Sequence, residues 1–154
     1  MANQLSSFLA GICNYHSRDM ASYAILITND GGGTNTFSTI SAKKNSTAIT
    51  GGTALTLPSQ DGGVHNSLHE AQPIGIRAAN NSISTTPATG DVNMAFLFVD
   101  NGSGGYTTSV KYGATSIDGT ALTLPTYTQT TGLALRTAYL RAFRACLNDR
   151  STNG

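Results

Sequence analysis

The chain has 154 residues, of which only 11% are charged, and its formal net charge is +1. Soluble domains usually carry about 25% charged residues, so Ser, Thr, Asn and Gly must supply most of the polar surface of what we expect to be a single domain, residues 1–154. A net charge this small excludes steering to nucleic acid or to an anionic membrane by a global field.

The first twenty residues predict a short helix and no export signal. Apolar residues within 3–13 recur at i, i+3, i+4 and i+7, the spacing of one helical face. The segment lacks the basic start of a signal peptide, and no apolar run of the chain approaches the roughly 18 residues of a membrane helix. We therefore expect a soluble chain made in the cytoplasm, with no membrane partner.

Two segments predict antiparallel β-hairpins. In the first, a β-branched apolar run at 23–28 and an alternating strand at 34–41 flank a glycine-rich turn at 29–33. In the second, an apolar run at 94–99 and an alternating strand at 106–112 flank another glycine-rich turn at 100–105. The two hairpins therefore resemble each other in the pattern of their strands, whereas their loop lengths differ.

Each hairpin is followed by the same heptapeptide, GTALTLP, at 52–58 and at 119–125. The heptapeptide is thus the end of an internal repeat, about 23–58 and 94–125. Under strand periodicity Leu55 and Leu57 point the same way, as do Leu122 and Leu124, so each copy places two leucines in a shared core. We expect a mainly β, α+β fold of duplicated antiparallel hairpin units, packed as a β-sandwich or barrel.

The segment between the repeats shows weaker patterns. It predicts a helical turn at 64–71, a short strand at 74–78 and an exposed polar loop at 80–90. The C-terminal helix, about 132–149, is the clearest element of the chain. Its apolar stripe consists of Leu135, Tyr139, Ala142, Phe143 and Cys146.

Three arginines of this helix, Arg136, Arg141 and Arg144, lie off the apolar stripe and are candidate partner contacts. Guanidinium groups suit an acidic protein surface or nucleic acid. Nucleic acid is the less favoured partner, because the chain has little net charge. The alternative is a solvated helix face whose arginines favour the helix C-terminus.

No residue set predicts catalysis, a cofactor or a metal. His65 and His69 stand at i, i+4 with Glu70 beside them, but no third ligand is evident and Asn66 occupies the place of the zincin glutamate. The glycine-rich turns lack the series of oxygen ligands that calcium needs. Cys13 can pair with Cys146, although free buried thiols are the favoured interpretation.

In composition and in its GTALTLP-ended hairpins the chain resembles small accessory virion proteins of tailed bacteriophages, of the capsid cement or decoration type. The resemblance implies a non-enzymatic structural protein located in the virion. Its partners would be further copies of itself and a major capsid or other virion protein. Two alternatives stay open: a tail-tube or coat subunit that self-assembles, and a lectin-like or adhesin β-sandwich that binds through the two glycine-rich turns.

Overall fold

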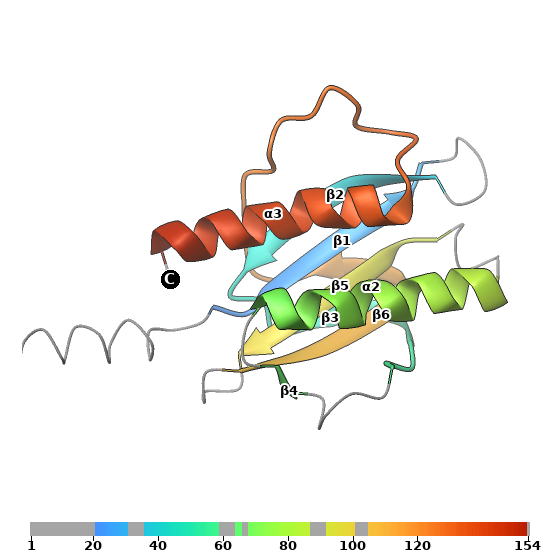
Figure 1. Ribbon diagram of the computed structural model, residues 1–154, viewed down its shortest axis with the longest axis horizontal. Helices are drawn as coiled ribbons and strands as arrows, with labels where there is room; N and C mark the ends of the chain where they lie inside the picture. Colours follow the sequence, from blue (N-terminus) through green and yellow to red (C-terminus); the bar gives the residue numbers. More distant parts are fainter. Residues whose placement is uncertain are drawn as a thin grey trace, which may run out of the picture.

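The computed structural model describes residues 21–30, 36–58, 64–65, 68–86, 92–100 and 105–153. These residues form one antiparallel sheet with two helices side by side on one of its faces (Figure 1). Neither described helix is long and apolar enough to cross a membrane. The helix predicted at 3–13 lies outside the described residues.

The sheet is open and has the strand order β3-β6-β5-β1-β2-β7, with the short strand β4 also paired to β6. All of its pairings are antiparallel. The strands are β1 (Tyr23–Asn29), β2 (Phe37–Lys44), β3 (Ile49–Ala54), β4 (Val64–His65), β5 (Met94–Asp100), β6 (Tyr106–Ile117) and β7 (Thr120–Ala121). The helices are α2 (Leu68–Thr85) and α3 (Leu135–Asn153).

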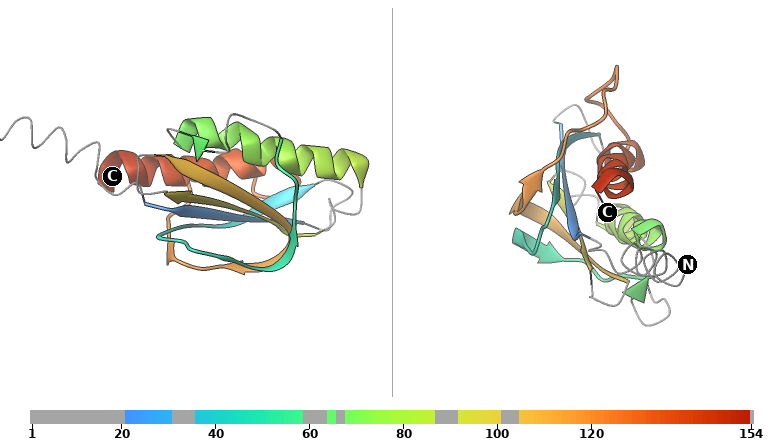
Figure 2. Two further views of the ribbon diagram at one scale, coloured as in Figure 1. Left: turned by 90° about the horizontal axis from the view of Figure 1, so that it is seen from below. Right: turned by 90° about the vertical axis from the view of Figure 1, so that its left-hand side faces the viewer.

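Both predicted hairpins form, as β1 with β2 and β5 with β6. The closed barrel does not form, because the sheet ends at β3 and β7. Nor do the described residues build a second sheet: α2 and α3 occupy the face where a sandwich would place one (Figure 2). Alternate apolar residues of β1 and β5 point toward the helices and are buried by them. The helices thus cover the apolar face that a second sheet covers in a sandwich.

Aromatic packing holds α3 on the sheet. Tyr139 of α3 meets Phe96 of β5 edge to face at 4.6 Å between ring centroids, and Phe143 meets Phe98 at 5.6 Å. All four rings are buried, so each contributes both apolar area and a favourable ring geometry. The predicted apolar stripe of the C-terminal helix is confirmed, since all of its members are buried.

Helix α2 corrects the strand predicted at 74–78 and the first part of the loop predicted at 80–90, because residues 74–85 are helical. Residues 87–90 of that loop lie outside the described residues. The helix is hard to predict from the sequence because Pro73 and Gly75 are residue types that usually interrupt helices. Gly75 has a packing reason: a Cβ there would lie 3.1 Å from the Phe96 ring and 3.5 Å from the Tyr139 hydroxyl. The glycine therefore allows α2 to approach β5 and α3 closely.

The two GTALTLP copies occupy corresponding places in the sheet. The backbone N–H of Leu55 donates to the Val110 carbonyl at 2.9 Å, and that of Leu122 donates to the Ala42 carbonyl at 2.8 Å. Each copy therefore pairs with the second strand of the other hairpin. The prediction of a shared core holds for the leucines, which are partly buried against the main core, namely Leu55, Leu57, Leu122 and Leu124.

This pairing makes the connections 45–48 and 118–119 meet over the face opposite the helices (Figure 2). Buried Ser46 donates from its hydroxyl to the Asp118 carbonyl at 2.9 Å. The Asp118 carboxylate accepts hydrogen bonds from the backbone N–H groups of Thr47 at 2.8 Å and Ala48 at 2.9 Å, and also from the Thr47 hydroxyl. We call these contacts the connection crossing. A small apolar cluster lies beneath it, consisting of Ala24, Leu26, Ile49, Ala95, Leu97, Ala114 and Ile117.

Gly119→Ala is expected to destabilise the fold by about 2 kcal/mol or more, because a side chain there meets both strain and overlap. Gly119 has a φ of +106°, and a Cβ would overlap the Lys44 carbonyl oxygen and lie 2.8 Å from the Ser46 hydroxyl. Chemical denaturation measures the loss. The matched control is Gly113→Ala, where φ is +73° but the nearest atom is 3.8 Å away. An equal loss in both variants would show that backbone strain alone matters.

Stability should fall as Asp118 is protonated. Hydrogen bonds from Thr47 and Ala48 lower the pKa of this carboxyl from 3.8 to about 2. A carboxyl with a lowered pKa stabilises the fold fully above its unfolded pKa, and this contribution disappears as the pH falls from about 4 to about 2. Melting temperatures of the wild type and of Asp118→Asn, measured from pH 7 to pH 2, should therefore differ most near pH 7 and converge near pH 2. A constant difference across this range would contradict the assignment.

Candidate functional site

The structure separates the three predicted arginine contacts. Arg136 and Arg144 are exposed on α3, whereas Arg141 is half-buried. The Arg141 Nε donates to the Pro125 carbonyl at 3.3 Å, and its guanidinium lies 5.4 Å from the centroid of the Tyr127 ring. Arg141 therefore holds a segment of its own chain, residues 122–132, against α3.

Residues 122–132 leave the sheet after β7 and project beyond it before α3 begins (Figure 1). The segment contains no charged residue and most of it is exposed. Arg141 is not the only residue that holds the segment. The Asp30 carboxylate also holds it by accepting a hydrogen bond from the Gly132 backbone N–H. Leu133, which follows, exchanges backbone hydrogen bonds with Phe37 at 2.7 and 3.0 Å. The projection is thus anchored at both ends.

A fourth arginine, Arg77, is exposed on α2 and was not predicted as a contact. The inner faces of α2 and α3 pack on the sheet, so the exposed side chains of both helices point away from it. We call the surface marked by Arg77, Arg136 and Arg144 the helix face. The only ion pair found among the described residues joins Lys44 to an aspartate of α3, and it involves none of these three arginines.

The charge of the helix face is positive. Helix α3 contains four arginines and a single aspartate, Asp149. Asp149 is already neutralised, because its carboxylate lies 3.2 Å from the Lys44 ammonium and accepts a hydrogen bond from the Tyr23 hydroxyl at 3.0 Å. Helix α3 therefore carries a net positive charge, whereas on α2 Glu70 balances the charge of Arg77.

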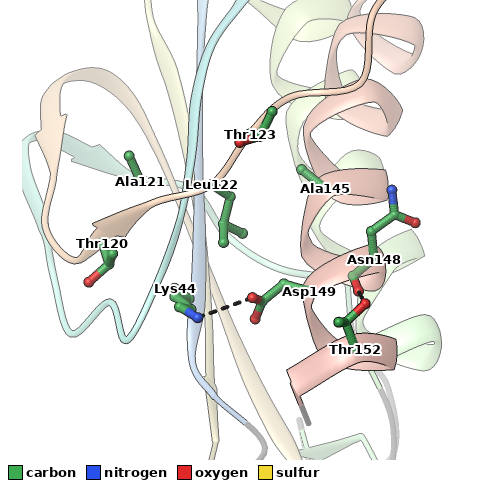
Figure 3. Close-up of a pocket in the computed structure, with 9 residues that line it drawn as sticks. All are labelled: Lys44, Thr120, Ala121, Leu122, Thr123, Ala145, Asn148, Asp149 and Thr152. Carbon is green, nitrogen blue, oxygen red and sulfur yellow. Dashed lines mark hydrogen bonds and ion pairs between the residues drawn. The ribbon is translucent and has the colours of Figure 1, made fainter.

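An open groove of about 420 Å³ lies between α3 and the strand β7 (Figure 3). The Lys44–Asp149 ion pair crosses it, with Leu122 and Ala145 on its apolar side. Its other lining residues are polar or small, namely Thr120, Ala121, Thr123, Asn148 and Thr152. Because its two charges pair with each other, the groove offers no unpaired charge to a ligand.

The ionisable groups beneath α3 are not activated for chemistry. Burial raises the pKa of Tyr106 to about 12, and it raises the pKa values of Tyr23 and of the Cys146 thiol as well. These groups therefore stay protonated at neutral pH, whereas a nucleophilic cysteine needs a lowered pKa. The Arg150 guanidinium donates to the Tyr106 hydroxyl at 3.2 Å, which ties the end of α3 to the sheet.

The remaining sequence candidates show no assembled site. Within the described ranges, no group of three His, Cys, Asp or Glu side chains is placed to hold a metal ion. His69 is exposed at the start of α2, and the side chain of His65 lies outside the described residues. Cys146 is a buried free thiol, and Cys13 lies outside the described residues. No family model, no curated protein and no solved structure matches the chain.

Arg141→Ala should loosen residues 122–132 without unfolding the core. The variant loses the hydrogen bond to Pro125 and a cation–π contact worth about 0.5–1 kcal/mol at an exposed site. Chymotrypsin should then cleave after Tyr127 several times faster than in the wild type, while the melting temperature changes little. Arg136→Ala is the matched control and should leave the cleavage rate unchanged. Equal cleavage rates in all three proteins would show that Arg141 does not anchor the segment.

Proposed function

We propose that the chain is a non-enzymatic structural protein of a virus particle, a capsid cement or decoration protein that stabilises the shell through subunit contacts. The observation that carries this proposal is the helix face, where Arg77, Arg136 and Arg144 are exposed. The partner is an acidic surface on a major capsid or other virion protein, because guanidinium groups pair with carboxylates in fixed, bidentate geometry.

The amino-acid composition also supports a role within an assembly. A surface with only 11% charged residues resists self-association poorly in free solution. The same surface suits a protein whose neighbours cover part of it. Many copies on one particle also bind multivalently, so each contact can be smaller than the roughly 1,600 Å² of a standard interface.

A second candidate function is a tail-tube or coat subunit that assembles with itself. The projecting segment, residues 122–132, favours it, since an uncharged and mostly exposed segment can reach a neighbouring copy. On this hypothesis the segment is the assembly contact, and the arginines of the helix face are secondary.

We further propose that the repeat reflects duplication of one β-hairpin unit with its third strand. Two observations support it: the heptapeptide GTALTLP is identical in both copies, and each copy pairs with the second strand of the other hairpin. Duplication explains why a chain of this length repeats seven residues.

Binding to an acidic probe tests the helix face. We expect full-length protein to bind immobilised poly-L-glutamate in a salt-sensitive manner, and Arg136→Ala/Arg144→Ala to bind about tenfold more weakly. The matched control is Thr107→Glu/Ser109→Glu, which lowers the net charge by the same two units at exposed positions of β6, away from the helices. An equal loss in both variants would reduce the effect to net charge and remove the helix face as the site.

Mass photometry of the full-length protein separates the two candidate roles. A closed oligomer of a few copies supports the cement protein. Tubes or shells support the self-assembling subunit. A stable monomer that also ignores poly-L-glutamate would overturn both proposals.

A further inference from the structure

The two halves of the chain, residues 21–86 and 92–153, complete each other's sheet. Within a half, only β1–β2 and β5–β6 pair. The ladders β1–β5, β3–β6, β4–β6 and β2–β7 all join one half to the other. We call these four ladders the seam.

The helices are exchanged in the same sense as the third strands. Helix α2 belongs to the first half but packs on β5 and β6, whereas α3 belongs to the second half and packs on β1 and β2. Each hairpin is therefore bordered by the third strand of the other half and covered mainly by its helix. Helix α3 also contacts β5 of its own half through the rings of Tyr139 and Phe143. A single half would leave much of the inner face of its own hairpin uncovered.

The registers on the two sides of the seam correspond. Ala24 lies opposite Lys43 and Ala95 opposite Lys111, within the two hairpins. Lys43 in turn lies opposite Ala121, and Lys111 lies opposite Ala54. The strand order has the same symmetry. If β1, β2 and β7 are exchanged with β5, β6 and β3, the order read from one edge becomes the order read from the other edge. The two sides of the seam are therefore nearly equivalent in their strand pairing.

A surface with this property also fits a second copy of the chain. We infer that the seam is a protein–protein interface, and that two chains form an exchanged dimer in which the first half of each chain pairs with the second half of the other. The contacts of the seam are the same in the monomer and in this dimer. The exchange therefore adds no new contact to the seam.

Concentration decides between the two forms. A partner half on the same chain acts at an effective concentration on the order of millimolar, so the monomer dominates in dilute refolding. Refolding near millimolar chain concentration makes the second copy competitive. The inference concerns pairing of the halves, so it does not depend on the proposed role in a virus particle.

A cysteine pair across β2 and β7 detects the exchange in full-length protein. Leu122 donates its N–H to Ala42, so the neighbouring pair Lys43 and Ala121 is the non-hydrogen-bonded kind. In such a pair the Cα atoms are about 4.5 Å apart, within the range of a disulfide. Two chains, Lys43→Cys and Ala121→Cys, each also carrying Cys13→Ser and Cys146→Ala, are unfolded, mixed, refolded together and oxidised.

We expect an interchain disulfide that is scarce after refolding at about 10 μM and rises at least tenfold in yield near 1 mM, measured by non-reducing electrophoresis and intact mass. The mismatched mixture of Lys43→Cys and Ala54→Cys should stay unlinked, because Ala54 lies opposite Lys111. The double variant Lys43→Cys/Ala121→Cys should close within one chain in dilute solution. The inference is overturned if the matched mixture links no better than the mismatched one at 1 mM, or if the double variant fails to close. Neither result affects the poly-L-glutamate binding test.

Discussion

The fold depends on the crossing of the two third strands. After β2 the chain does not return along its own hairpin, but passes over the sheet to the free edge of β6; after β6 it passes to the free edge of β2. The two connections meet, and Asp118 holds the meeting point by accepting hydrogen bonds from Thr47 and Ala48. Each helix follows the third strand of its half in the sequence. The crossing therefore also places α2 mainly on β5 and β6, and α3 mainly on β1 and β2.

The sequence predicts those elements whose side-chain spacing shows a regular strand or helix period. The β1–β2 and β5–β6 hairpins and α3 follow from runs of alternating or helically spaced residues. The exchange of the third strands could not be predicted, because two identical heptapeptides carry no information about which hairpin each one joins. Helix α2 was missed because Pro73 and Gly75 argue locally against a helix, whereas the Gly75 backbone is needed for contact with Phe96 and Tyr139.

The candidate site was predictable only as far as helical periodicity reaches. Arg136 and Arg144 lie off the apolar stripe, and both are exposed. Arg141 lies off the stripe as well, yet it binds Pro125 and Tyr127 from the projecting segment, a contact that no helical pattern contains. Arg77 could not be predicted for a different reason: residues 74–78 resemble a strand in the sequence, so they indicate no helix face on which to place it.

The edges of the sheet indicate where a partner can bind. Strand β7 has only two residues, and β3 contains Gly51 and Gly52 with φ values of +71° and +82°. Short or irregular edge strands are poor templates for a further strand, and natural sheets use them to prevent edge-to-edge association. Extension of the sheet is therefore disfavoured at both ends. The proposed contacts with other molecules accordingly use the helix face and residues 122–132, where side chains rather than backbone groups would recognise the partner.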